Sequence, residues 1–142
     1  MLSEKITLEV LRQQAKGTIS EHLGIEFTEI GEDYICARMP VDHRTRQPYG
    51  ILHGGASVVL AETLGSIGAA FSVDLSRYRT VGLDINSNHI RPVREGFVYG
   101  KASPLHLGQT THVWQIVITN EEGKLVNISR LTMAVVEIDK LK

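Results

Sequence analysis

The sequence predicts an α+β domain in which a single antiparallel sheet wraps around one long central helix. From Ala56 to Phe71 the chain has no proline and consists mostly of good helix formers, which predicts a helix of about four to five turns. The segments before and after this helix are short runs with alternating apolar residues, which is typical of strands joined by turns. One sheet packed against one helix accommodates this order of elements.

Length and composition indicate one globular domain, spanning residues 1–142. Charged residues make up 22% of the chain and hydrophobic ones 42%, and a chain of this length buries a core without disulfides. Cys36 is the only cysteine, so no intrachain disulfide can form, and a reducing compartment fits best.

The same features argue against several classes of partner. The formal net charge of -1 gives no bulk attraction to nucleic acid or to an anionic membrane. The N-terminal residues lack the apolar stretch of a signal peptide, and no apolar run is long enough for a membrane span. We therefore expect a cytoplasmic protein without a nucleic-acid or membrane partner.

The segments before the central helix predict a short helix and a hairpin. Residues 7–14 form a short apolar pattern behind Thr7, a candidate N-cap. Residues 23–30 and 34–39 alternate in part and are joined by a Gly-containing turn, which predicts a β-hairpin. Residues 41–52 have the polar composition of an ordered loop that leads into the helix.

Four strands are predicted after the central helix. They span residues 80–92, 97–107, 110–119 and 125–138. Because short turns join them in succession, the expected arrangement is an antiparallel meander.

The central helix carries two stripes of residues, one bulky and one small. The bulky stripe suits a sheet behind the helix and the small one suits close approach by another element. The bulky residues are Ala56, Leu60, Leu64, Ile67 and Phe71, and the small stripe contains Val58, Glu62, Gly65, Ser66 and Ala69.

Glu62 is the candidate catalytic acid because it stands within this small, uncharged stripe. Ser66 is four residues further on and shares its face, so both side chains could touch one ligand. The alternatives are an ordinary solvated acid at Glu62 and a packing role for Ser66.

The start of the helix is a candidate oxyanion hole. Gly54 and Gly55 place backbone N–H groups at the positive end of the helix dipole, although they could also serve only to relieve backbone strain. Gln47 and His53 flank this terminus, and either could polarise a carbonyl or fix the loop.

These two candidate features are too far apart to act together in one chain. At the helical rise, the Gly55 N–H lies about 10 Å along the axis from Glu62, too far for both to contact one reacting carbon. A second copy of the helix, packed antiparallel, would bring its glycines beside Glu62. The sequence therefore predicts a composite site between two subunits.

Basic residues near the turn between the predicted strands 80–92 and 97–107, and on the second of these strands, could hold phosphates, or they could be ordinary exposed strand charges. They are His89, Arg91, Arg94, Lys101 and His106. The chain contains no HExxH, CxxC, P-loop, GxGxxG or GxSxG motif, and its six histidines are scattered. We therefore expect no metal and no cofactor.

Two segments carry a resemblance to a known family. QPYGILHGGASVVLAETLGS and VGLDINSNHIRPVREG resemble the hotdog-fold acyl-CoA thioesterases whose catalytic acid lies on the central helix, the 4-hydroxybenzoyl-CoA thioesterase branch. The resemblance extends over nearly the whole chain. It implies a hotdog fold, no cofactor, and a homodimer or homotetramer with active sites at the dimer interface.

The resemblance also implies roles for individual residues. Glu62 matches the acid that acts as nucleophile or general base, and Gly55 matches the oxyanion donor from the other subunit. Gln47 and His53 match residues near the thioester carbonyl, and Ser66 matches the hydroxyl residue four after the acid.

Four further positions match the substrate pocket of the family. His89 matches a pocket residue, and Ile67 lies where the acyl pocket is shaped. Arg91 and His106 match positions for the CoA nucleotide.

The function implied by the resemblance is hydrolysis of an aromatic acyl-CoA, similar to hydroxybenzoyl-CoA or to the 1,4-dihydroxy-2-naphthoyl-CoA of menaquinone biosynthesis. A second hypothesis is proofreading of misacylated aryl carrier proteins, with acyl carrier protein as partner. A third is a non-catalytic acyl-CoA binding module or a hotdog dehydratase. The release of free thiol separates the third hypothesis from the first two.

Overall fold

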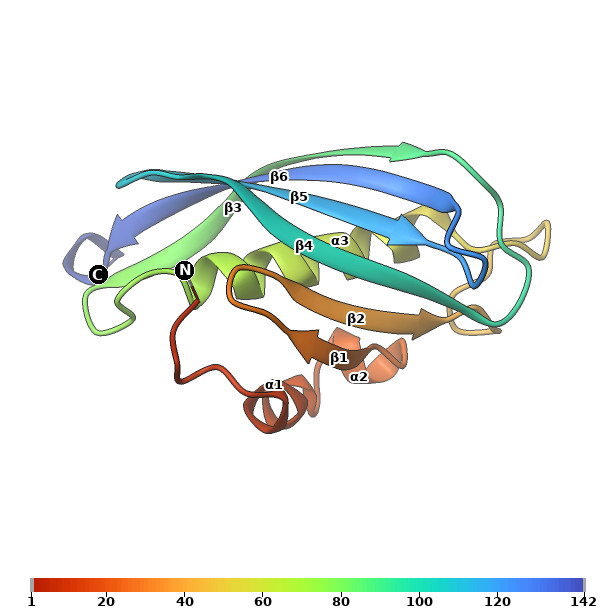
Figure 1. Cartoon of the computed structure of the whole chain (residues 1–142), viewed down its shortest axis with the longest axis horizontal. Helices are drawn as coiled ribbons and strands as arrows, with labels where there is room; N and C mark the ends of the chain where they lie inside the picture. Colours follow the sequence, from red (N-terminus) through yellow and green to blue (C-terminus); the bar gives the residue numbers. More distant parts are fainter. Residues whose placement is uncertain (1, 142) are drawn as a thin grey trace.

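The computed structural model describes residues 2–141 and shows one sheet curved around one long helix (Figure 1). The helix, α3 (Gly54–Ala70), lies along the inner face of a six-stranded sheet with the order β1-β2-β4-β5-β6-β3. All neighbouring strands are antiparallel. The strands are β1 (Glu26–Ile30), β2 (Ile35–Pro40), β3 (Tyr78–His89), β4 (Phe97–Leu107), β5 (Thr111–Thr119) and β6 (Leu125–Glu137).

The N-terminal part confirms the predicted helix and hairpin and adds one element. The Thr7 side chain caps α1 (Leu8–Ala15) by accepting the Val10 N–H at 3.1 Å, as predicted. The helix α2 (Ile19–His22), capped by Thr18, was not predicted, because one helical turn is too short to show a periodic pattern. A final 3₁₀ turn, η1, covers Ile138–Leu141.

The predicted four-strand meander is wrong, because β3 pairs with β6 and not with β4. Of the four strands after the helix, only β4, β5 and β6 follow one another in the sheet. The segment after β3 is not a tight turn. At its start, the Ile90 N–H still donates to the Val126 carbonyl of β6, and further along, the Val93 carbonyl accepts the N–H of Leu52, which lies just before α3. This segment therefore crosses the end of the helix and delivers β4 to the other side of the sheet.

Glycines on α3 allow the helix to lie close to the sheet. A Cβ placed on Gly68 would lie 2.6 Å from the fully buried Trp114 ring, and one on Gly65 would lie 2.7 Å from Leu131. The prediction that Gly65 faces away from the sheet is therefore wrong. Its lack of a side chain makes room for large residues of the sheet, while Leu60 and Leu64 fill the core as predicted.

Strand β3 forms an edge of the sheet and carries exposed apolar side chains. Val81 is 44% exposed and Leu83 is 64% exposed. Within residues 2–141, β3 pairs with β6 only, so its other edge has no strand beside it. An unpaired edge with apolar side chains is a surface that another strand can join.

Candidate active site

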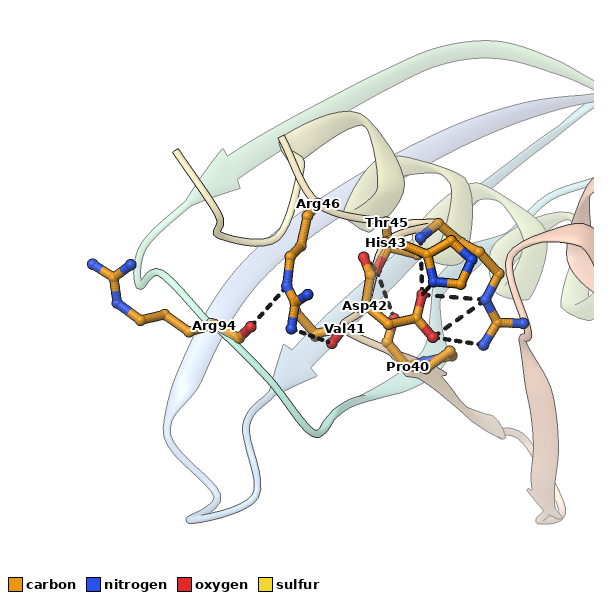
Figure 2. A network of polar contacts seen from close by, with 8 residues as sticks. Pro40, Val41, Asp42, His43, Thr45, Arg46 and Arg94 are labelled. Atoms are coloured by element: carbon orange, nitrogen blue, oxygen red, sulfur yellow. Dashed lines mark hydrogen bonds and ion pairs between the residues drawn. The ribbon is translucent and has the colours of Figure 1, made fainter. Parts of the chain in front are cut away.

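An ordered loop holds the start of α3 in place (Figure 2). The Asp42 carboxylate accepts hydrogen bonds from the Arg44 backbone at 2.9 Å and from its guanidinium at 2.7 Å. These hydrogen bonds lower the pKa of the Asp42 carboxyl to about 2, so the carboxylate is ionised at neutral pH. The Thr45 hydroxyl donates to the Pro40 carbonyl at 2.7 Å, and the His53 N–H donates to the Thr45 carbonyl at 2.7 Å.

A guanidinium ties the same loop to the segment after β3. Arg46 donates to the carbonyl of Arg94 at 3.0 Å and to that of Val41 at 3.4 Å, as Figure 2 shows. The loop at the helix start and the crossover to β4 are therefore fixed to each other.

His53 is the N-cap of α3, and its side chain takes up one glycine amide. The Gly55 N–H donates to His53 Nδ1 at 2.7 Å, while the N–H groups of Ala56 and Ser57 are directed at the His53 carbonyl. Of the two alternatives for His53, the structure supports the one in which it holds the loop and the helix start. The amide of Gly55, predicted as the oxyanion donor, is engaged within its own chain.

The Gly54 amide differs from the three amides that follow it, whose N–H groups are directed at His53. Its N–H has no hydrogen-bond partner among residues 2–141. Because Gly54 is the first residue of α3, this N–H has no acceptor inside the helix either. It is thus a free donor at the positive end of the helix dipole.

A cavity of about 440 Å³ opens beside this free amide. Its wall contains Gln47, Ile51, Leu52, Gly54, Ser57, His89, Ile90, Arg91, Pro92 and Val126. The Gln47 side-chain oxygen accepts the Tyr49 N–H, which fixes the loop and turns the amide nitrogen of Gln47 away as a remaining donor. Three of the predicted residues, Gln47, His89 and Arg91, therefore line one cavity.

His89 and Arg91 reach the cavity from the end of β3. A Cβ on Gly54 would lie 2.8 Å from His89 Nε2, so the imidazole lies against the start of α3. One guanidinium nitrogen of Arg91 donates to the carbonyl of Leu125 at 2.6 Å. The charged group of Arg91 is therefore held at the rim of the cavity.

The predicted basic cluster is divided in the structure. His106 lies near the far end of β4, opposite Val113, nine residues and roughly 30 Å along the strand from Phe97. Lys101 lies over the Tyr34 ring at 4.3 Å, away from the cavity. Grouping these residues with Arg91 within one chain is wrong, because β4 runs away from the end of β3 instead of folding back along it.

Glu62 and Ser66 lie together further along α3, beside β3. A Cβ on Gly82 would lie 3.0 Å from a Glu62 carboxylate oxygen, and the Ser66 hydroxyl is 3.9 Å from the Met133 sulfur. Gly82 and Met133 are cross-strand partners, so the two side chains do share a face, as predicted. Both are half-buried, as is Ile67, which packs against the core one residue further on.

Within one chain, the acid and the free amide belong to two separate places. Glu62 does not line the cavity at Gly54, and their separation of eight positions corresponds to about 12 Å along the helix. Each chain carries two half-sites, an acid near the middle of α3 and a donor group at its start, and their meeting between two subunits stays a prediction.

Sequence reasoning missed a set of polar residues beneath His89. Asn127 is fully buried, and its side-chain nitrogen lies 3.1 Å from His89 Nδ1. Ser57 is also buried and lines the cavity. The available signal was the presence of Asn127 and Ser129 among the otherwise apolar inward-facing residues of β6, because buried polar side chains require partners.

Two findings concern what residues 2–141 lack. They contain no group of three or more His, Cys, Asp or Glu side chains that could hold a metal ion. None of the helices in this part of the chain is long and apolar enough to cross a membrane.

Comparisons with known proteins agree with this architecture. A family model described as the thioesterase superfamily matches residues 49–127. A crystal structure of a thioesterase from Haemophilus influenzae superposes with a TM-score of 0.93 at 50% identity, covering 96% of this chain and 95% of that chain.

Two relatives with more detailed names are similar along nearly their whole length. The chain is 52% identical over 131 residues to the 1,4-dihydroxy-2-naphthoyl-CoA hydrolase of Escherichia coli, covering 92% of this chain and 96% of the relative. It is 49% identical over 130 residues to the proofreading thioesterase EntH of Cronobacter turicensis, covering 92% and 94%. With the family model, the fold and these relatives in agreement, the chain belongs to the thioesterase superfamily and is a hotdog-fold thioesterase.

Proposed function

We propose that this thioesterase hydrolyses an aromatic acyl-CoA to the free acid and CoA, in active sites formed between two subunits. The observation that carries the proposal is the free N–H of Gly54, a residue in the wall of a cavity at the start of α3 that also contains the polar side chains of Gln47 and His89. A thioester oxygen at this N–H would accept a hydrogen bond and meet the positive end of the helix dipole.

The reaction assigns one task to each half-site. The Gly54 amide stabilises the negative charge that develops on the thioester oxygen, and Glu62 of the other subunit attacks the carbonyl carbon or takes a proton from the attacking water. If water attacks, the carbon–sulfur bond breaks, the thiolate of CoA takes up the proton and the acid is released. If Glu62 attacks, breaking the carbon–sulfur bond leaves a mixed anhydride on Glu62, which a water molecule then hydrolyses to the free acid and the carboxylate. Ser66, four residues after Glu62, is positioned to orient the water or the acyl group.

The residues around the cavity support binding of the rest of the substrate. Gln47 lies in the same cavity wall as Gly54, and its side-chain nitrogen, which has no hydrogen-bond partner among residues 2–141, could donate to a carbonyl oxygen. Arg91 supplies a positive charge at the rim for the CoA phosphates. Ile67 follows Ser66 at the place proposed for the acyl group, and we retain His106 as a candidate contact to CoA bound by another subunit.

A homodimer, alone or paired into a homotetramer, is part of the same proposal. The apolar edge of β3 lies directly beside Glu62. A second copy that adds its own β3 antiparallel to this edge would cover Val81 and Leu83 and bring its α3 alongside. The Gly54 amide of that copy would then approach Glu62, which the spacing along a single helix does not permit.

A charge at the edge of β3 should weaken this dimer and, with it, activity. Leu83→Lys places a charged group in the proposed interface, so the dimer dissociation constant should rise about tenfold or more. We expect thioesterase activity per chain to fall on dilution and to recover at high protein concentration. Light scattering and rate measurements over a concentration series test this, with Leu105→Lys as the matched control, because Leu105 is 56% exposed and lies on β4. Parent-like mass and activity for Leu83→Lys at every concentration would rule out this interface.

The substrate is tested with a panel of thioesters. We expect kcat/KM to be highest for benzoyl- and hydroxynaphthoyl-CoA and lower for straight-chain fatty acyl-CoA of similar size, as measured by release of free thiol. A preference for fatty acyl chains would contradict the aromatic assignment. The name of the Escherichia coli relative supports including 1,4-dihydroxy-2-naphthoyl-CoA.

The second candidate function is proofreading of misacylated aryl carrier proteins, which the name of the Cronobacter relative favours. It uses the same half-sites and differs only in the carrier of the acyl group. Comparing kcat/KM for one aromatic acyl group on CoA and on a carrier protein separates the two functions, since a proofreading enzyme should prefer the carrier protein.

A further inference from the structure

A closed set of hydrogen bonds lies beneath His89, on the inner face of the sheet. Ser87 and His89 of β3 stand opposite Ser129 and Asn127 of β6 in the strand register. Asn127 is 0% exposed and Ser129 is 2% exposed, whereas the His89 ring reaches the exposed side. These side chains therefore connect the buried interior to a residue in the wall of the cavity.

The orientation of the Asn127 amide in the structure sets the direction of each hydrogen bond. Asn127 Oδ1 can only accept, so the proton on its 2.8 Å contact with the Ser129 hydroxyl belongs to Ser129. The 2.8 Å contact between the hydroxyls of Ser129 and Ser87 is then filled by the proton of Ser87. The Asn127 nitrogen donates one proton to Ser87 Oγ at 2.8 Å.

The second proton of the Asn127 amide is directed at His89. The nitrogen lies 3.1 Å from His89 Nδ1, and because an amide nitrogen cannot accept, Nδ1 must be the acceptor. The ring proton of a neutral His89 is then on Nε2. This is the nitrogen that lies against Gly54, whose own N–H is free.

We propose that Asn127 is a positioning residue that holds His89 as the Nε2–H tautomer, so that this N–H is a second donor to the thioester oxygen bound at Gly54. The inference rests on the proposed function for its substrate, and on the hydrogen-bond set alone for the tautomer. In the orientation that the structure shows, every polar atom of the Asn127 side chain has a partner: Oδ1 accepts from Ser129, and the nitrogen is directed at Ser87 and His89.

The tautomer is tested by ¹⁵N NMR of the histidine rings in the whole protein, without substrate. In the parent protein, His89 Nδ1 should have the chemical shift of an unprotonated ring nitrogen and Nε2 that of a protonated one. Asn127→Ala should give the averaged shifts of a ring that exchanges between tautomers, and Asn127→Asp, which offers only acceptors, should move the proton to Nδ1. A parent spectrum with the proton on Nδ1, or one unchanged by both substitutions, would overturn the proposal.

The catalytic part is tested by a double-mutant cycle. Asn127→Ala should lower kcat about threefold to tenfold, the effect of one neutral hydrogen bond, with little change in KM. In the background of His89→Ala, the same substitution should have no further effect on kcat, because it acts only through His89. If the losses in kcat from Asn127→Ala and His89→Ala add in the double variant, or if Asn127→Ala changes KM alone, Asn127 does not act through His89 in catalysis.

A nearby apolar substitution controls for loss of stability. Ile118 is fully buried and is the cross-strand neighbour of Asn127 on β5. Ile118→Val should lower the unfolding midpoint without changing kcat or the ¹⁵N shifts of His89. A parent protein inactive on every thioester would refute the proposed function while leaving the tautomer result to stand by itself, so the two failures can be told apart.

Discussion

Replacing Glu62 by glutamine should lower kcat about 10²- to 10⁴-fold, the range for losing a positioned acid or base. The amide has nearly the shape of the carboxylate but can neither attack the carbonyl carbon nor take a proton from water. Glu62 is half-buried beside Gly82, so the substitution changes few packing contacts. Stopped-flow measurement of thiol release with a saturating aromatic acyl-CoA gives kcat directly.

A second substitution on α3 shows whether this loss is specific to the acid. Thr63 is the neighbouring residue and is also half-buried. The Thr63→Ala variant should have nearly the kcat of the parent protein and the same mass in solution. Should Glu62→Gln fold, form the dimer and turn over at the parent rate, Glu62 would have no part in the mechanism.

Replacing Gly54 by proline should lower kcat about 10²- to 10³-fold more than replacing it by alanine, as expected for the loss of one oxyanion donor. Proline removes the N–H and nothing else from the first turn of a helix, where its fixed φ is well accommodated. The preceding residue, His53, has φ -68 and ψ 129, which a following proline accepts.

Alanine at the same position is the matched control. Its Cβ would meet the His89 ring, as that of proline would, but the N–H remains. The ratio of the two kcat values therefore removes the effect of the Cβ and reports the replacement of the N–H by the proline ring carbon. Equal values for the two variants would remove the Gly54 N–H from the mechanism and return attention to Gly55, whose N–H is held by His53 at 2.7 Å.

The sequence predicted the elements well because their signals are local. The proline-free run that begins at Ala56, the Thr7 cap and the alternation along β5 each depend on a few neighbouring residues, and all three are present in the structure. The comparisons likewise agree with the hotdog thioesterase family that the sequence resembled. They favour a hydrolase over a non-catalytic binding module.

The order of the strands and the individual side-chain hydrogen bonds were not predicted, mainly because they depend on residues far apart in the chain. The pairing of β3 with β6 was missed since a run of seven residues before β4 looks like a turn in the sequence, and this error also misplaced His106. The capture of the Gly55 amide by His53 depends on a side-chain rotation, which sequence spacing does not reveal. Asn127 lies 38 positions from His89 and meets it only through the strand register.

The open edge of β3 also has a consequence for newly made protein. A single chain presents Val81 and Leu83 at the outer edge of β3, the kind of surface on which aggregates grow. In the proposed dimer, assembly would cover this surface as well as complete the active site. Synthesis at low abundance would leave chains that are both inactive and exposed to proteolysis or chaperone capture, so the amount of working enzyme should rise more steeply than the amount of chain.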